Sequence, residues 1–449
     1  MSTLRSRSVE MTPAALPTLV RSVWPLLVGV GVALALQFFA KPVIGDFYAK
    51  VLLDIGTSII LAVSLTMVNG FTGQFSIGHA AFMMVGGYVS GGIVYYGSLL
   101  AWGSADMAGG ALSSMIDGRE APFLTWGDAL FAGSLVAGGL VAAVCGYVVG
   151  LPSLRLKGDY LAIVTLGFGE IVRVLIQSQT SDVLYTVEEV KETAWYLMPT
   201  KVGGALGFSG LPFYSSLFWV FLGVAVTLLV AYRLKDSATG RAFLSIREDE
   251  IASEAMGVNT TQFKVRAFVI AAFFAGVAGG LFAHSIGVQL NPGELGFLKS
   301  FDIIIMVVLG GLGSISGAAI AAAIVTILPE LLRNPEPLLK MWPVLAGLAA
   351  VLLVAAVVCA MTGRRARSLV AWMCIVLTLL GLGFGARAAA AAGHNLGDYR
   401  MILFALALIL MMILRPQGLF GVREVWDRSL WKGIADSFRA PPKKGGTNK

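Results

Sequence analysis

The chain has 449 residues, of which 57% are hydrophobic, 13% are charged and 54 are glycine. Soluble domains carry about 25% charged residues, so this composition excludes an ordinary soluble protein and indicates an integral membrane protein. The formal net charge of +7 does not indicate nucleic-acid binding, because the basic residues cluster beside apolar runs, where they orient membrane spans.

Apolar runs that approach the ~20 residues of a membrane-crossing helix recur along the chain. They lie near residues 22–40, 49–69, 77–97, 127–150, 160–178, 216–232, 265–286, 315–333, 342–362, 368–390 and 399–415. A further run at 301–313 is too short to cross untilted. Because unpaired backbone groups are not tolerated in lipid, and because the runs are too uniformly apolar for barrel strands, the sequence predicts an all-α polytopic protein with about 10–12 spans, including broken or short helices.

Basic clusters predict the orientation of these spans. If the N-terminus is cytoplasmic, every cluster falls on the cytoplasmic side, as the positive-inside rule requires, and the C-terminus is cytoplasmic too. The clusters are Arg5, Arg7 and Arg21; Arg155 and Lys157; Arg233 and Lys235; and Arg364, Arg365 and Arg367. No cleavable signal is evident, so we expect the first run to be a retained span.

The stretch NGFTGQFSIGHAAFMMVGGY at 69–88 places polar residues and glycines inside an apolar region. Ser76 is expected to cap the helix that follows, and Gly78 and its neighbouring glycines allow the backbone to break. A helix that begins at membrane depth points its N–H groups at an anionic ligand, which makes Gln74, Ser76 and His79 candidate residues of a substrate path. The alternative is that the glycines permit close packing and that Ser76 and His79 bond to neighbouring helices.

The segment 154–175 carries a second polar set. Glu170 and Arg173 are spaced to pair on one helix face, an explanation that we favour over a proton relay. Thr165 either lines a pore or is a small residue that lets a neighbouring helix pack closely.

The decapeptide GQFSIGHAAF at 73–82 aligns without gaps to GLGSISGAAI at 311–320. Internal repeats of this kind are typical of transporters, so Gly310, Gly311 and Ser314 join the candidate path. The sequence leaves open whether 301–333 crosses twice or once with a break, and whether the repeats are parallel or inverted. Asp302 is expected to cap the first helix of this segment, and Pro329 and Glu330 to mark a helix end.

Polar intervals at 98–126 and 179–215 are expected outside, and one at 233–264 inside. Within the last, 246–256 is predicted to form one amphipathic helix, with Ile246, Ile251, Ala252 and Ala255 on one face, ended by Gly257. The residue pattern of this segment fits a solvated connector and a docking surface equally well.

The chain has no phosphate-binding loop and no zinc-protease or nucleophile-elbow motif. Its three cysteines, Cys145, Cys359 and Cys374, lie in apolar runs and are expected to pack there. We therefore expect a protein that is not an enzyme, with no catalytic residue and no metal site.

Five collinear stretches resemble the inner-membrane permeases of branched-chain amino acid ATP-binding cassette (ABC) transporters, of the LivM type. They span about 70 to 421 and read GQFSIGHAAFMMVGGY, LRLKGDYLAIVTLGFGEIVRVL, GRAFLSIREDEIASEAMGVNTTQFKVRAFVIAAFFAGVAGGL, FLKSFDIIIMVVLGGLGSISGAAI and YRMILFALALILMMILRPQGLFG.

This resemblance implies a permease subunit in the bacterial inner membrane that works with a second related permease, two cytoplasmic ATPases and a periplasmic binding protein. ATP and Mg would be bound by the ATPases, and this chain would bind no cofactor. SEAMG at 253–257 is similar to the loop by which such permeases engage the ATPase. The resemblance therefore implies a coupling role for Arg247, Glu248, Glu254, Ala255 and Gly257.

Two regions depart from the family pattern. The outer loop 179–215 is unusual, and 334–396 is expected to be an inserted two-span hairpin between a core at 1–333 and a last span with its tail at 397–449. Urea or short amides remain alternative substrates. An ion-coupled transporter, with Glu170 as its only good acidic candidate, and a channel-like facilitator remain alternative classes.

Overall fold

The computed structural model describes residues 15–40, 45–106, 108–113, 122–153, 160–285 and 288–333, and five single positions beyond them (405, 409, 418, 421 and 424). Every regular element in these residues is helical, and Phe208 and Leu290 add one isolated antiparallel bridge. The predicted all-α class is therefore confirmed. The predicted hairpin at 334–396 lies outside the described residues, as does almost all of 397–449.

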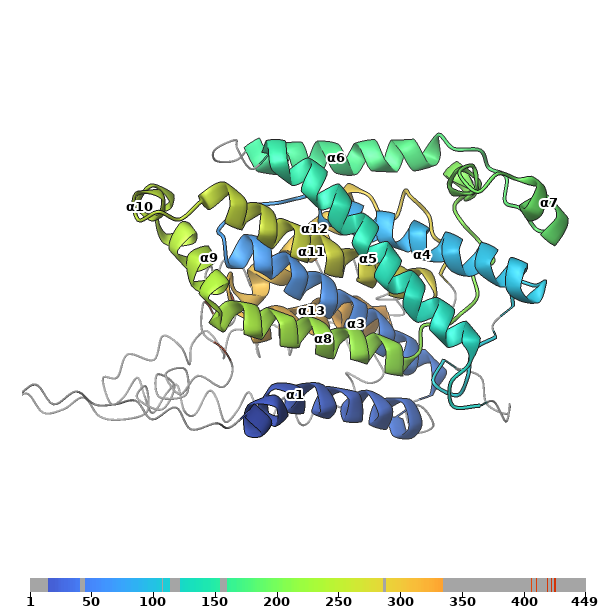
Figure 1. The fold of residues 1–449 in the computed structure, drawn as a ribbon, viewed down its shortest axis with the longest axis horizontal. Coiled ribbons are helices and arrows are strands. Elements are labelled where there is room, and N and C mark those ends of the chain that lie inside the picture. The colour runs from blue at the N-terminus through green and yellow to red at the C-terminus, as the bar shows by residue number, and fades with distance from the viewer. Residues whose placement is uncertain are drawn as a thin grey trace, which may run out of the picture.

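The helices follow the predicted runs (Figure 1). In chain order they are α1 (Ala15–Ala35) with η1 (Leu36–Ala40), α3 (Asp46–Leu65) with η2 (Thr66–Gly70), α4 (His79–Trp102), α5 (Trp126–Ser153), α6 (Tyr160–Gln177), α7 (Val187–Glu192), η3 (Met198–Thr200), η4 (Gly204–Leu206), α8 (Leu217–Asp236), α9 (Ala238–Glu248), α10 (Glu250–Ala255), α11 (Thr260–Ala283), α12 (Phe297–Gly310) and α13 (Ile315–Arg333).

Five described segments are long and apolar enough to cross a membrane. They are Asp46–Gly70, Trp126–Pro152, Tyr160–Gln177, Leu217–Asp236 and Thr260–Ala283. Val23–Phe39 and Ile315–Glu330 are apolar but shorter, and α12 has only 14 residues, as its short run predicted. The chain is therefore a multi-pass membrane protein that combines full spans with short helices.

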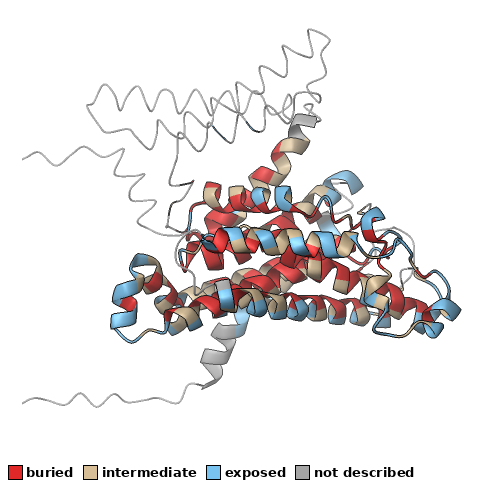
Figure 2. Cartoon of the chain, turned by 90° about the horizontal axis from the view of Figure 1, so that it is seen from above, coloured by how far each residue is buried: buried red, intermediate tan, exposed pale blue. Residues whose placement is uncertain are grey.

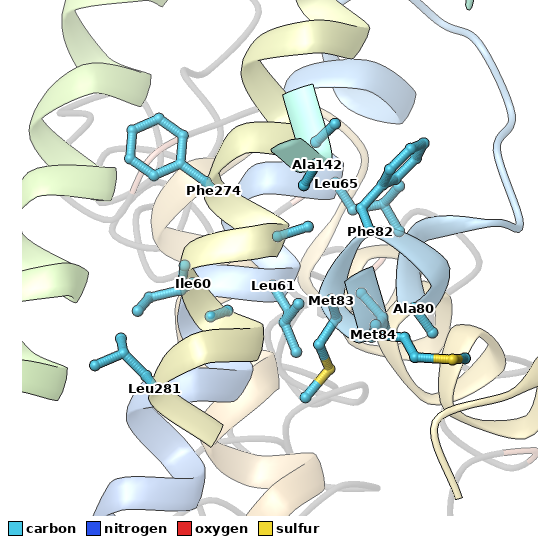
Figure 3. Packing of buried hydrophobic residues seen from close by; sticks show 14 of the residues in the cluster. Ile60, Leu61, Leu65, Ala80, Phe82, Met83, Met84, Ala142, Phe274 and Leu281 are labelled. Atoms are coloured by element: carbon cyan, nitrogen blue, oxygen red, sulfur yellow. The ribbon is translucent and has the colours of Figure 1, made fainter. Parts of the chain in front are cut away.

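Helix α11 forms the centre of the bundle, where it packs against α3, α4 and α5. Figure 3 shows side chains of these helices meeting there, including Leu61 of α3, Met83 of α4, Ala142 of α5 and Leu281 of α11. Figure 2 shows buried residues gathered inside the bundle and exposed residues mainly at its ends and along its outer helices. Helices α1 and α6 lie at opposite edges of the bundle in Figure 1, and α7 and the α9–α10 pair lie at its opposite ends.

The close approach of α4 and α11 depends on glycine. A Cβ atom at Gly279 would overlap the carbonyl group of Met83, and one at Gly86 would overlap the backbone of Gly276. Small residues let the backbones of two membrane helices come into contact. Van der Waals packing then holds the helices together, because the hydrophobic effect does not drive helices together in lipid.

The predicted helix at 246–256 is wrong, because the chain breaks at Asp249. The Asp249 carboxylate accepts a hydrogen bond from the N–H of Ala252 (3.0 Å) and so caps a separate helix, α10. Ile246 is buried in α9, whereas Ile251 is 75% exposed; Ala252 and Ala255 are exposed as well. The predicted stop is confirmed, since Gly257 has φ +86° and its N–H donates to the carbonyl of Glu254 (2.9 Å).

One smaller prediction in the 301–333 segment is also wrong. Asp302 does not cap α12, which begins at Phe297 after Gly296. Pro329 and Glu330 lie within the last five residues of α13, which ends at Arg333, so their expected place near the end of the helix is confirmed.

We predict that Gly279→Ala destabilises the bundle, because even a methyl group at this position overlaps the α4 backbone. Overpacking of this kind costs about 1–3 kcal/mol or more. The thermal midpoint of the detergent-solubilised chain measures the effect. Gly133→Ala on α5 is the matched control, since nothing lies within 4 Å of its added Cβ; equal midpoints for the two variants would contradict the described packing.

Candidate functional site

The first candidate site is the break between α3 and α4. Helix α3 continues as the π-helical turn η2 to Gly70, and α4 begins only at His79. Three side chains accept hydrogen bonds from backbone N–H groups of the break and of the first turn of α4. Asn69 Oδ1 accepts from the Ser76 N–H (3.2 Å), Thr165 Oγ1 on α6 accepts from the Ile77 N–H (3.1 Å), and Ser300 Oγ on α12 accepts from the Ala80 N–H (3.3 Å).

Ser76 is not the N-cap that the sequence predicts. Gly78 occupies that position and no side chain caps it, because the acceptors for the nearby N–H groups come from α6 and α12. Gly78 lies so close to Thr165 that an added Cβ would overlap the Thr165 carbonyl. Thr165 therefore acts both as a hydrogen-bond acceptor and as a packing neighbour of the break.

The side chain of His79 forms a hydrogen bond with a neighbouring helix, as predicted by the interpretation in which His79 has a packing role and not a substrate-path role. Its Nε2 atom lies 2.8 Å from Ser64 Oγ of α3, and its side chain is buried. This hydrogen bond joins the first turn of α4 to α3. The structure thus assigns His79 a helix-joining contact, and the described cavities do not include it among their lining residues.

Three buried polar atoms at the first break have no hydrogen-bond partner among the described residues: Ser76 Oγ, Asn69 Nδ2 and Gln74 Oε1. Leaving one such group unpaired costs about 1–3 kcal/mol, so native structures rarely gather several without a functional reason. The cavity beside them, lined in part by Ile77, Gly78 and Glu170, measures only about 10 Å³. That volume is about one water molecule, so this cavity admits no larger solute in this conformation.

The second candidate site is the break between α12 and α13. Residues 311–314 form the turn, and Gly311 and Gly313 have φ values of +110° and +98°. The chain bends so sharply that an added Cβ at Gly310 would lie 2.5 Å from the N atom of Ala318. Both copies of the repeat therefore have the same structure along the chain: a helix, a break that contains glycine, and a second helix.

The two breaks lie against each other. An added Cβ at Gly70 would lie 2.7 Å from the N atom and 2.9 Å from the Cα atom of Gly313. The structure thus brings together the candidate residues of both breaks, with Gln74, Ser76, Gly78, His79 and Thr165 around the first and Gly310, Gly311 and Ser314 in the second.

Glu424, which sequence reasoning missed, fills the N-terminus of α13. Its carboxylate accepts hydrogen bonds from the N–H groups of Ile315 (3.1 Å) and Ser316 (3.0 Å) and from the hydroxyls of Ser316 (2.6 Å) and Ser314 (3.3 Å). It also pairs with Lys235 at the end of α8. The only sequence signal was its place three residues after the RPQGLFG motif, more than a hundred positions from its partners.

The electrostatics of Glu424 follow from these contacts. Burial would raise the pKa of its carboxyl, but the hydrogen bonds from Lys235, Ser316 and Ile315 together outweigh burial and hold the pKa below its usual value. The carboxylate is therefore ionised at neutral pH. Its stabilising contribution is complete there and is lost only in acid, as the pH falls through this lowered pKa.

Two cations from the 233–264 interval reach the two breaks. Arg247 Nη1 on α9 donates to the Gly70 carbonyl (2.9 Å), and Lys235 Nζ donates to the Gly313 carbonyl (3.0 Å). Arg247 also pairs with Glu248 (2.9 Å). The end of α8 and the helix α9 that follows it thus touch the backbone of both breaks directly.

The predicted coupling residues beyond Arg247 and Glu248 lie on and just after α10. The Glu254 carboxylate accepts from the Thr260 hydroxyl (2.6 Å) and so ties α10 to the start of α11. Ala255 and Gly257 are exposed, and Met256 between them is 84% exposed. An apolar tip at one end of the bundle is therefore available for contact.

The predicted pair on α6 is confirmed. Arg173 Nη2 lies 2.7 Å from Glu170 Oε2, and Arg173 Nη1 donates to Gln177 Oε1 (2.9 Å). The charge of Glu170 is thus compensated on its own helix.

We predict that His79→Ala lowers stability, because it removes the hydrogen bond to Ser64 and leaves a buried void. Losses of this kind amount to about 2–4 kcal/mol. Thermal unfolding of the solubilised chain measures the effect, with His79→Gln, which can still reach Ser64, as the milder control. An unchanged midpoint for His79→Ala would contradict the helix-joining role.

The family model described as "Branched-chain amino acid transport system / permease component" matches residues 47–348. LivM, a high-affinity branched-chain amino acid transport system permease protein of Salmonella typhimurium, is 33% identical over 292 residues, which cover 62% of this chain and 61% of LivM. LivM of Escherichia coli is 32% identical with the same coverage. LivH of Salmonella typhimurium is 25% identical over 64% of this chain and 82% of LivH.

The matched region spans about three fifths of the LivM chains. No solved structure matches this chain. Because the family model covers more than half of the chain and the motifs that carry the resemblance lie largely inside its limits, this protein belongs to the family of permease components of branched-chain amino acid transport systems.

Proposed function

We propose that this chain is the transmembrane permease subunit of an ABC importer that takes up branched-chain (hydrophobic) amino acids. The observation that carries the proposal is the meeting of two helix breaks at Gly70 and Gly313, each held by a cation from the 233–264 interval. A path that opens where related halves meet is the usual plan of transporters. Membership of the family supports branched-chain amino acids as the proposed substrate class.

The proposed assembly contains a second related permease, two cytoplasmic ATP-binding subunits that carry ATP and Mg, and a periplasmic substrate-binding protein. The relatives named LivM and LivH support a pair of permeases. The exposed tip of α10, at the opposite end of the bundle from α7, supports a docking surface for the ATPase. These supports favour docking over a solvated connector, and they fit an inner-membrane protein with both termini cytoplasmic.

In the proposed mechanism, closure of the ATPases moves α10, α9 and the adjoining end of α8, and thereby moves the backbone of both breaks. Arg247 would transmit the movement to the Gly70 carbonyl and Lys235 to the Gly313 carbonyl. Ser76, Asn69 and Gln74 would then present their unpaired polar atoms to the solute. Within the described residues, Gly311 and Ser314 serve internal contacts to the C-terminal segment, so we propose the first break as the principal path.

A cavity of about 670 Å³ between α4, α6 and the outer loop supports a hydrophobic solute. Its lining includes Tyr88, Ile93, Tyr96, Leu100 and Trp195, a surface that favours a leucine-like side chain over urea or a short amide. Ion coupling is disfavoured because Glu170 is already paired with Arg173. We also retain the proposed division into a core at 1–333, an inserted hairpin at 334–396 and a last span with its tail at 397–449.

We predict that Glu254→Lys and Gly257→Val each abolish amino acid uptake while the chain still inserts into the membrane. The first reverses the charge that ties α10 to α11, and the second forces a β-branched residue into a left-handed conformation. Uptake of labelled leucine by cells, with immunoblots of the membrane fraction, measures both effects. Asp236→Lys is the control, since it reverses an exposed charge next to these helices but not on α10; normal uptake in the two test variants would refute the coupling role.

We further predict that Ser76→Ala leaves stability unchanged but lowers uptake several-fold. The Ser76 hydroxyl has no partner among the described residues, so its removal breaks no structural hydrogen bond, whereas a solute in the path would lose one. Thermal unfolding and the concentration dependence of leucine uptake separate the two effects. Unchanged uptake kinetics would remove Ser76 from the path.

A further inference from the structure

We propose that Glu424 and Lys235 form a latch that holds the break between α12 and α13 closed and must release it during transport. We define the latch as the Glu424 carboxylate, the Lys235 ammonium group and the N-terminus of α13 (Ile315 and Ser316). This inference rests on the proposed transport function and adds to it a device that involves the C-terminal segment.

The first step of the argument concerns the α13 N-terminus. Helix N-termini present unpaired N–H groups and a partial positive charge, and they bind anions readily. Here the Glu424 carboxylate of the same chain occupies the anion site at the helix N-terminus. It accepts four hydrogen bonds from Ser314, Ile315 and Ser316. The carboxylate of a solute could reach this helix end only after Glu424 leaves.

The second step concerns Lys235, which joins the latch to both breaks. Its Nζ atom pairs with Glu424, donates to the Gly313 carbonyl (3.0 Å) and lies 5.9 Å from the ring centre of Phe71 in the first break. Its side chain is 19% exposed and that of Glu424 is 8% exposed. Charges held this far from water are stable only while they remain paired, so partial opening is disfavoured and the latch is either made or broken as a unit.

The third step concerns the backbone next to the latch. An added Cβ at Gly418 would lie 2.6 Å from the Cα atom of Gly311, and one at Gly311 would lie 2.7 Å from the N atom of Gly421. The C-terminal residues thus lie directly on the turn of the second break. The turn cannot change shape without displacing them, which makes release of Glu424 a condition of opening.

The test is a reversible cross-link between Ser316→Cys and Glu424→Cys in a chain whose own three cysteines are replaced. The two wild-type side chains are in contact (Ser316 Oγ to Glu424 Oε2, 2.6 Å), so a short thiol cross-linker should join them in membranes. We expect cross-linking to abolish leucine uptake and reduction to restore it. Uptake that persists in the cross-linked protein, or failure of the pair to cross-link at all, would overturn the latch.

The matched control is Ser90→Cys with Ser134→Cys, which joins α4 to α5 away from both breaks (Oγ to Oγ, 2.8 Å). Cross-linking this pair should leave uptake intact. If no variant, including the parent chain, transports leucine, the proposed function fails rather than the latch, and the following measurement still tests the latch.

That measurement is the rate at which a membrane-impermeant maleimide labels Ser314→Cys in inside-out vesicles. Ser314 is fully buried, so labelling should be slow in the parent background and several-fold faster with Glu424→Gln or Lys235→Met. Arg241→Met, which removes an exposed cation of α9, should change nothing, and labelling of Ser90→Cys should stay slow if the bundle remains folded. Equal labelling rates with and without Glu424 would refute the proposal.

Discussion

A backbone that stops being helical inside an apolar bundle must find hydrogen-bond partners for its own N–H and C=O groups, because lipid offers none. This requirement explains the polar residues that interrupt the apolar sequence. The first break is satisfied by Asn69, Thr165 and Ser300, and the N-terminus of α13 after the second break by Glu424. Thr165, Ser300 and Glu424 are distant in sequence from the N–H groups that they bind, so these contacts tie the bundle together across the breaks.

The need to pair backbone groups also explains why side chains of the 233–264 interval contact both breaks. Carbonyl groups at Gly70 and Gly313 need donors, and those donors are Arg247 and Lys235. Glycine allows the two breaks to touch, so in the proposed mechanism a displacement of α8 and α9 would act on both at once. Arg247 and Lys235 therefore satisfy the backbone of the breaks, and in the proposed mechanism the same two side chains would transmit movement to it.

Local patterns predicted much of this structure. The helical class, the short α12, the two glycine breaks and the Glu170–Arg173 pair all follow from periodicity or from spacings of a few residues. Ser76 as a cap and a continuous 246–256 helix were wrong because acceptors from α6 and α12 replace the expected cap and because Asp249 caps a new helix within the run. Glu424, and the contact of Arg247 with Gly70, depend on residues far apart in the chain, which one sequence without tertiary contacts does not reveal.

The central claim of the proposed mechanism is that the two breaks move together under the control of α9 and α10, where we propose that the ATPase docks. It is tested most directly by the distance between spin labels at Phe75→Cys and Leu312→Cys, one exposed position in each break, measured by pulsed electron paramagnetic resonance in the reconstituted transporter. We expect the distance to change by several ångströms when the partner ATPases are trapped with ATP, and to return after hydrolysis. A distance that stays constant throughout the cycle would contradict the account.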